Sequence, residues 1–184
     1  MFIGFNDEMK KILKSLVGKK LLYFEGDFEE KWNRVYSYLR INTNDGSIDL
    51  TNEESYIDFI EEKEDVTCLK CQTSKFNNIK DEFKLSSKYV SSNIIINDVV
   101  KEINIITEII IKEGAENIEY DKGIEIVTEN HSYLFYTKSW FDEYIYYSFD
   151  NNRYDELYPI DEDLKVWKNG ENVNVKIERK KELL

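Results

Sequence analysis

The chain contains very few of the residues on which most enzyme sites depend. Its 184 residues include one histidine, one proline, two cysteines, one alanine and seven glycines. No P-loop, GxGxxG or GxSxG sequence occurs, so there is no recognisable phosphate-binding loop and no nucleophile elbow. These absences favour a non-enzymatic binding role. No cofactor, metal or catalytic residue is expected.

The two cysteines form a single CxxC sequence, Cys68 to Cys71. A structural zinc site needs four ligands, and the chain has no second cysteine pair and no histidine nearby. A thioredoxin-type site places CxxC at a helix N-terminus, whereas these cysteines fall within a predicted strand that points them to opposite faces. We expect one cysteine in the core and the other outside, with no metal or redox role.

The chain also lacks long apolar runs. The longest β-branched stretch, Ile103 to Ile111, is interrupted by polar residues, so nothing approaches the ~20 residues that span a bilayer. The first residues do not show a basic region followed by an apolar core. Without a secretion signal, two cysteines suggest reduced thiols, so we expect a cytoplasmic protein.

Charge is the most unbalanced property of the composition. Twenty-five basic residues stand against 37 acidic ones, a formal net charge of −12. A field of that sign repels nucleic acid and anionic membranes and attracts basic proteins. The alternative explanation is solubility alone. If there is a partner, it is therefore expected to be a basic protein, and the oligomeric state is left open.

With 41% hydrophobic residues, the chain has enough apolar material for a core, and its length fits a single domain over residues 1–184. Phe5, Met9, Ile12, Leu13, Leu16 and Val17 share one helical face, with Asn6 or Asp7 as N-cap and Gly18 at the stop. Thereafter the period is two. The fold class expected is α+β: mainly antiparallel β-sheet with an N-terminal helix.

Strands are predicted at 19–25, 35–43, 65–73, 94–96, 100–111, 123–128, 133–137 and 144–149. Asp45-Gly46 predicts a two-residue hairpin loop in which Thr43 opposes Ile48 and Ile41 opposes Leu50. A capping box at 51–54 predicts a short helix. The stretch 74–92 is the candidate linker. A last hairpin, within 164–178, is expected to turn on Asn169-Gly170 and to place Leu164 opposite Val175.

Two hairpins resemble each other in sequence. Residues 39–48 align without a gap on residues 124–133, so that Thr43 meets Thr128 and Ser47 meets Ser132. The hypothesis is an internal repeat with halves at 17–73 and 93–150, forming pseudo-duplicated hairpin units. The alternative is coincidence between two ordinary hairpins. The alignment puts His131 at the position of Gly46, which favours an exposed turn residue, tolerated at positive φ, over a general base.

Acidic runs occur at 25–30, 61–65 and 161–163 and most often form solvated faces. Aromatic residues, in contrast, concentrate between Tyr133 and Tyr158. Because residues of both parities are aromatic along 144–149, that strand is either covered on both sides or exposes a tyrosine-rich face. The predicted partner-binding residues are Tyr133, Trp140, Phe141, Tyr144, Tyr146, Tyr154, Asp155 and Glu156.

Three functions remain open on the sequence. The first is an acidic protein-binding module, in its most specific form an immunity or antitoxin-type inhibitor of a basic toxin such as a nuclease. The second is a small-ligand or carbohydrate-binding module that uses an aromatic cleft. The third, an enzyme acting through carboxylates alone, would require two carboxyl groups buried in one cleft.

Overall fold

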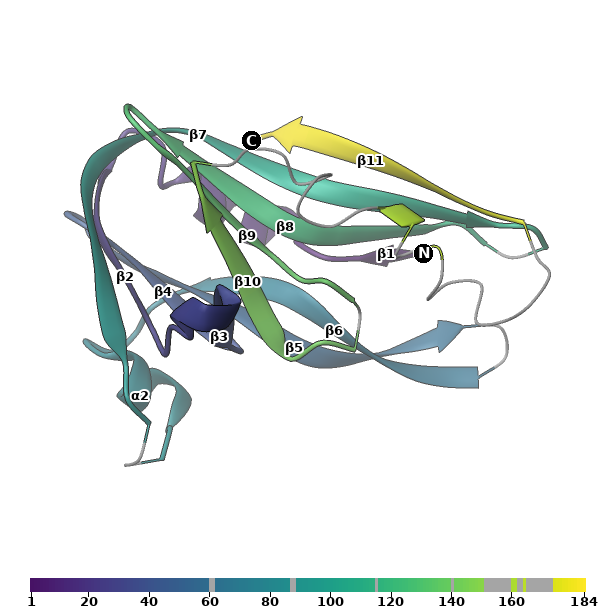
Figure 1. The fold of residues 1–184 in the computed structure, drawn as a ribbon, viewed down its shortest axis with the longest axis horizontal. Helices are drawn as coiled ribbons and strands as arrows, with labels where there is room; N and C mark the ends of the chain where they lie inside the picture. Colours follow the sequence, from purple (N-terminus) through teal and green to yellow (C-terminus); the bar gives the residue numbers. More distant parts are fainter. Residues whose placement is uncertain are drawn as a thin grey trace.

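A computed structural model describes residues 1–59, 62–86, 89–114, 116–139, 141–150, 160–161, 164 and 174–184, without the side chains of 57–64. Most of this part is antiparallel β-sheet, as predicted, with short helical segments (Figure 1). The strands are β1 (Phe2–Ile3), β2 (Lys20–Gly26), β3 (Arg34–Tyr36), β4 (Tyr38–Thr43), β5 (Gly46–Phe59), β6 (Glu62–Thr73), β7 (Ser92–Lys112), β8 (Ile118–Thr128), β9 (Ser132–Tyr136), β10 (Tyr144–Phe149) and β11 (Val175–Leu183). The helices are α1 (Asp7–Lys14), η1 (Glu30–Trp32) and α2 (Ile79–Phe83).

The long strand β7 belongs to two sheets that lie over one another (Figure 1). Its first part pairs with β2, which continues to β4, β5 and β6; its second part pairs with β8, which continues to β9, β10 and β3. Asn97, at a positive φ of 60°, lies near the change of partner. Only Ser37 separates β3, which pairs with β10, from β4, which pairs with β2 and β5. The chain therefore passes between the two sheets a second time at this residue.

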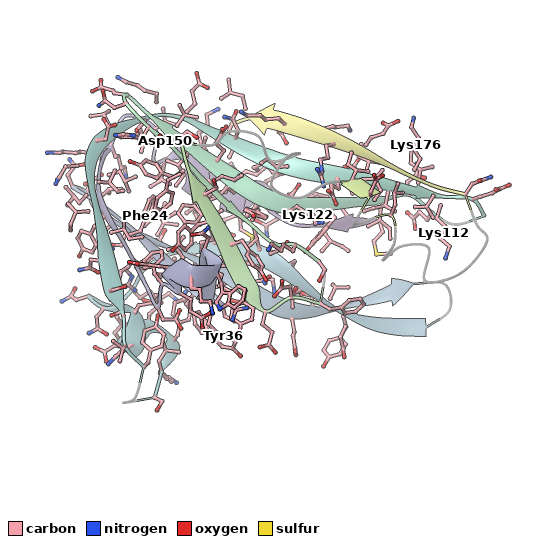
Figure 2. The ribbon with its side chains drawn as sticks, viewed as in Figure 1. Phe24, Tyr36, Lys112, Lys122, Asp150 and Lys176 are labelled. Atoms are coloured by element: carbon pink, nitrogen blue, oxygen red, sulfur yellow. The ribbon has the colours of Figure 1, made fainter. Side chains whose placement is uncertain are left out.

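The described residues form two larger hydrophobic cores and a small third cluster of Ile106, Leu134 and Tyr136, against which Tyr146 packs. The main core fills the space between the sheets, where the fully buried Phe24 ring meets Tyr133 and Phe135 edge-on (Figure 2). A second core lies further along β7 and β8, where Ile110 and Tyr120 pack with residues of β6 and β11. Strand β1 pairs in parallel with β8 beside this second core.

The predicted first helix is confirmed as α1. Asn6 caps it by accepting a hydrogen bond from the Met9 amide, and Leu13 is fully buried on its inner face. The helix ends at Lys14, and tighter turns carry the chain on to Gly18, whose φ of 84° fits the glycine expected there.

The β4–β5 hairpin forms where predicted, but the predicted register is wrong by two residues. Ile41 pairs with Ile48, and Thr43 pairs with Gly46, so the loop is Asn44-Asp45. The Thr43 hydroxyl donates to the Gly46 carbonyl at 2.8 Å and accepts from the Asp45 amide, which closes the observed two-residue loop. A shift of two keeps every side chain on its predicted face.

The helix predicted at the capping box does not form, because residues 51–59 continue strand β5. Strand β5 pairs with β6 along its length, from Ile48 opposite Thr73 to Phe59 opposite Glu62. Thr51 and Glu53 still meet, since residues two apart lie on one face of a strand: the Thr51 hydroxyl donates to the Glu53 carboxylate at 2.8 Å. Twelve cross-strand pairs outweigh a local helix signal.

The structure differs from the sequence predictions at several further places. The strands predicted at 94–96 and 100–111 form the single strand β7, and β8 begins at Ile118 rather than residue 123. The stretch 74–92 contains α2, which packs on sheet strands through the stacked rings of Tyr38 and Phe83. Leu164 is helical and Val175 pairs with Lys112, so the predicted Leu164–Val175 pair is wrong, while the Asn169-Gly170 turn lies outside the described residues.

Two runs of four strands, β2–β4–β5–β6 and β7–β8–β9–β10, have matching registers. Asn42 opposite Ser47 in the first run corresponds to Val127 opposite Ser132 in the second. The next hairpins match too: the Ser74 amide donates to the Ser47 carbonyl, and the Asp150 amide donates to the Ser132 carbonyl.

The first strands of the two runs agree as well. Strand β2 has a register shift at 21/23 opposite Thr43, and β7 has one at 100/102 opposite Thr128. Three residues before each shift stands a residue at positive φ, Gly18 in one run and Asn97 in the other. We refer to β2–β4–β5–β6 as the first run and to β7–β8–β9–β10 as the second run.

Candidate functional site

Strand β10 divides its aromatic side chains between the core and the surface. Ile145, Tyr147 and Phe149 pack in or against the main core, whereas Tyr144 and Tyr146 lie half-buried on the opposite face. The outer face of β10 is therefore partly open and partly covered, because Tyr146 also packs against the buried cluster of Ile106, Leu134 and Tyr136.

The outer surface of β3, β10 and β9 brings further rings together, and we call it the aromatic face. Tyr36 of β3 pairs with Tyr144, their rings 5.5 Å apart edge-on, and Tyr136 of β9 pairs with Tyr146, their rings 5.7 Å apart. The aromatic face comprises Trp32, Arg34, Tyr36, Lys138, Tyr144, Tyr146 and, in the loop before β10, Phe141; Tyr136, against which Tyr146 packs, is buried. Its most exposed rings are Trp32 at 57%, Phe141 at 55% and Tyr36 at 43%.

Cations of the chain itself lie on these rings. The Arg34 guanidinium lies 3.6 Å from the centre of the Tyr144 ring, and the Lys138 ammonium lies 4.0 Å from that of Tyr146. Lys31 lies 4.8 Å from the centre of the Trp32 ring. Each contact is a cation–π interaction, which holds both partners in place.

Carboxylates fix the orientation of the same side chains. Glu29 accepts a hydrogen bond from Arg34 Nε at 2.7 Å, and Glu143 accepts one from the Tyr36 hydroxyl at 2.7 Å. The latter bond raises the pKa of Tyr36 to about 12. Burial and a hydrogen bond to Asp142 raise the pKa of Tyr146 to about 12. These tyrosines stay protonated and act as hydrogen-bond donors at neutral pH.

The loop that leads into β10 is tied to the facing sheet. The Asp142 carbonyl accepts hydrogen bonds from the side chains of Asn52 and Thr67, and the Glu143 carbonyl accepts from the Ser37 hydroxyl. Ser37, at a φ of 56°, is the residue where the chain passes from β3 to β4. The loop before β10 is therefore tied to both sheets, which fixes the position of the aromatic face beside it.

The structure separates the predicted binding residues. Tyr133 is 5% exposed and belongs to the main core, where burial raises its pKa to about 12, so it does not reach the surface. Phe141, Tyr144 and Tyr146 lie together on the aromatic face. Trp140, Tyr154, Asp155 and Glu156 lie outside the described residues.

Trp32, Arg34 and Tyr36 were not predicted from the sequence. They come from η1 and β3, which precede β10 by more than a hundred residues, and only the β3–β10 pairing brings them to Tyr144. The available signal was the short alternation Arg34-Val35-Tyr36, which puts valine inside and the other two outside.

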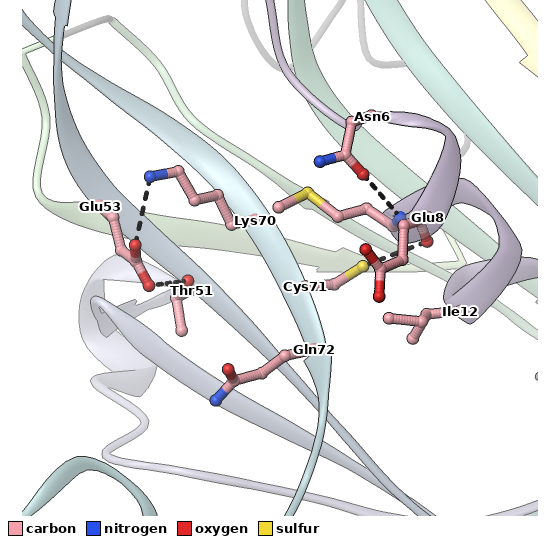
Figure 3. Close-up of a pocket in the computed structure, with 9 residues that line it drawn as sticks. Asn6, Glu8, Ile12, Thr51, Glu53, Lys70, Cys71 and Gln72 are labelled. Carbon is pink, nitrogen blue, oxygen red and sulfur yellow. Dashed lines mark hydrogen bonds and ion pairs between the residues drawn. The ribbon is translucent and has the colours of Figure 1, made fainter.

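Two hollows in the described part have no phenylalanine, tyrosine or tryptophan in their lining. One, of about 260 Å³, lies between α1 and the β5–β6 pair, where Lys70 points to Glu53 and Cys71 points to α1 (Figure 3). The other, of about 250 Å³, surrounds the β8–β9 turn. An aromatic cleft for a sugar is thus not among them.

His131 is half-exposed in the β8–β9 turn, as expected, but it is not among the described residues at positive φ. Its Nδ1 lies 2.9 Å from Asp150, and this contact lowers the pKa of the Asp150 carboxyl. The described residues contain no cluster of three or more potential metal ligands.

Both cysteines are free and buried, in different cores. Cys71 Sγ donates to the Met9 carbonyl, and burial raises its pKa to about 12. Cys68 packs in the second core. The expectation that one of the two cysteines would lie outside the core is therefore wrong. A thiol buried and protonated like that of Cys71 does not react readily.

Two buried ion clusters hold outer segments onto the sheets. Arg40 donates to Asp49 at 2.7 Å and to the Phe76 carbonyl, with Glu82 3.6 Å away. Glu108 lies 2.7 Å from Arg179 of β11 and 3.1 Å from Lys122 (Figure 2). Each buried charge has an opposite partner, which is typical of structural clusters.

Comparisons with known proteins return no relative: no family model, curated protein or solved structure matches the chain. Among the described helices, none has the length and apolar character needed to cross a membrane.

Proposed function

We propose that the protein is a non-enzymatic binding module that recognises a basic protein through the aromatic face. The observation that carries this proposal is a set of half-exposed rings, held rigidly by cation–π contacts and charged hydrogen bonds. Rigid tyrosine, tryptophan and arginine side chains are the types enriched at the energetic centres of protein interfaces.

The matching registers of the two runs supply an internal control. Tyr136 and Tyr146 pair across β9 and β10, and the corresponding pair across β5 and β6 is Thr51 and Lys70. Strands with this register therefore pair without aromatic side chains at those positions. Tyr136 itself is buried and packs with Ile106 and Leu134, so the partly exposed rings, such as that of Tyr146, are the ones that support a role in binding.

Charge favours a basic partner. Around the aromatic face, Asp27, Glu29, Glu30, Asp142 and Glu143 stand against Lys31, Arg34 and Lys138, so five carboxylates minus three cations leave −2. The whole chain carries −12. In the most specific form of the proposal, the module is an immunity or antitoxin-type inhibitor that covers the cationic site of a toxin such as a nuclease.

The register match also supports the proposed internal duplication. Equivalent hairpin turns, β-bulges and positive-φ residues recur in the two runs in the same order. The duplication extends the sequence alignment of 39–48 on 124–133 to four strands in each run. A solved relative containing one run alone, or two runs in another order, would test it.

The binding proposal is tested by site-specific photocrosslinking in the source cell. A photoreactive phenylalanine analogue is placed at Phe141 on the aromatic face or at Tyr56, an exposed tyrosine on β5. We expect one basic protein to crosslink from position 141 and not from position 56. Excess unlabelled protein should compete, whereas a Tyr144→Ala/Tyr146→Ala variant should compete at least about tenfold less well.

Lys70→Ala is the matched control, because Lys70 occupies the position of Tyr146 in the first run. It should compete as well as the wild type. Equal crosslinking from positions 141 and 56, or equal competition by the double tyrosine variant after its folding is checked by circular dichroism, would contradict the proposal.

A further inference from the structure

Tyr36 differs from its neighbours on the aromatic face in how its ring is used. Trp32, Tyr144 and Tyr146 each have a cation of the chain over the ring. No cation of the described part lies over Tyr36, although its side chain is 43% exposed. The Tyr36 ring is therefore open to a cation from outside.

The neighbouring residue Arg34 shows how this surface holds a cation. Its guanidinium stacks on the Tyr144 ring at 3.6 Å while its Nε donates to the Glu29 carboxylate at 2.7 Å. One aromatic ring and one carboxylate thus complete the site. Arginine suits such a site because its planar fork can stack and donate at the same time.

The same two components are present around Tyr36. Glu143 accepts the Tyr36 hydroxyl through Oε2, and its other oxygen has no partner among the described residues. Asp27 accepts the Tyr36 amide at 3.0 Å, and burial raises the pKa of the Asp27 carboxyl. An incoming cation would offset the cost of keeping that carboxylate charged.

We propose that Tyr36 and Glu143 form a subsite for one arginine or lysine side chain of the basic partner. The inference rests on the proposed binding function and specifies the chemistry recognised by one part of the aromatic face. The subsite is formed by the β3–β10 pairing, because Tyr36 comes from β3 and Glu143 immediately precedes Tyr144 of β10.

Octa-arginine and octa-glutamate peptides are the probes. Labelled peptide is titrated with the full chain at low and high salt and followed by fluorescence anisotropy, and binding is located by NMR shift changes. We expect octa-arginine to bind with shift changes at Asp27, Tyr36 and Glu143. Tyr36→Ala should weaken binding about three- to tenfold, the range of an exposed cation–π contact joined to a charge pair.

Glu143→Gln should weaken binding about threefold and reduce its salt dependence, because it removes one charge and preserves side-chain shape. Tyr36→Phe should retain most of the affinity, since the ring remains. Tyr56→Ala, at an exposed tyrosine elsewhere on the surface, should leave binding unchanged. This variant is the reference for the loss of an exposed tyrosine ring that lies away from the subsite.

Equal losses for Tyr36→Ala and Tyr56→Ala, or equal binding of octa-glutamate, would overturn the subsite. The proposed function is tested separately by the crosslinking experiment. If a partner crosslinks from position 141 but peptide binding does not depend on Tyr36, the binding function is retained and the subsite is rejected. Tyr36-dependent peptide binding without a crosslinked partner supports the subsite and argues against a resident protein partner.

Discussion

The first and second runs share a register but differ on their outer faces. In the first run Arg40 pairs across the hairpin with Asp49, and this buried ion pair is covered by the segment that contains α2. At the corresponding positions of the second run stand Glu125 and Leu134, and Lys181 of β11 reaches Glu125 at 2.6 Å. Two runs with the same register are thus covered in two ways, and they differ at their outer faces.

The largest expected effect comes from removing the cation of the first run. Arg40→Met leaves Asp49 and Glu82 buried without their cation, and we expect the free energy of unfolding to fall by about 3–5 kcal/mol. Lys181→Ala in the second run should cost no more than about 1 kcal/mol, because that side chain is 52% exposed. Urea denaturation of both variants measures the difference.

A double variant sharpens this comparison. Arg40→Met/Asp49→Leu places at residue 49 the residue type that the second run has at 134. It should recover a substantial part of the stability lost by Arg40→Met, because a buried carboxylate is removed along with its partner. Equal stability of Arg40→Met and Lys181→Ala would show that the ion pair does not hold the α2 segment in place.

The turns of the two runs provide the next prediction, through Asp98. Its carboxylate accepts hydrogen bonds from the Val99 amide, the Thr128 hydroxyl and the Asn130 amide. Burial acts to raise the pKa of Asp98, but these bonds outweigh it and lower the pKa from 3.8 to about 2. Asp98 therefore stabilises the fold above about pH 4, and this stabilisation is lost as the pH falls toward 2.

We expect Asp98→Asn to cost about 1–3 kcal/mol near neutral pH. The difference from wild type should shrink as the pH falls from about 4 to about 2. Denaturant unfolding at several pH values follows it. Asp45→Asn in the β4–β5 turn is the control, since Asp45 is 72% exposed and meets only Lys19 at 3.3 Å. A pH-independent cost at Asp98 would contradict the assignment.

The smallest effect distinguishes the two turn threonines. The Thr43 hydroxyl serves its own turn, whereas the Thr128 hydroxyl bonds within its turn and also reaches Asp98 at 2.7 Å. Thr128→Val should therefore destabilise more than Thr43→Val, by about 1 kcal/mol, because it also removes a hydrogen bond to a charged group. Thermal unfolding of both variants gives the comparison, and equal losses would make the Asp98 contact unimportant.

Local sequence patterns predicted where many of the strands lie along the chain. Alternation located β2, β6, β9 and β10, and helical spacing with the Asn6 cap located α1. The patterns failed where a non-local contact competed with a local one. The capping box at 51–54 lost to pairing with β6, and the Asp45-Gly46 turn moved because the Thr43 hydroxyl closed a different loop.

The candidate site was only partly predictable for the same reason. Aromatic residues on both parities of β10 left open whether the strand is covered on both sides or exposes one face, and Tyr144 and Tyr146 lie half-buried on the outer face. No local pattern indicated that Trp32, Arg34 and Tyr36 would join them, because that depends on a strand pair formed between distant parts of the chain. Nor could alternation alone place Tyr133 in the core rather than outside.

The β3–β10 pairing also has a consequence for the order of folding. The paired residues Tyr36 and Tyr144 are 108 positions apart in the sequence, and Phe2 pairs with Glu119 across a similar separation. Contacts of such separation require large loops to close first, which slows folding. A chain emerging from the ribosome cannot assemble the aromatic face until residues near 150 are available. The aromatic face is thus assembled late, after the second run has been synthesised and paired.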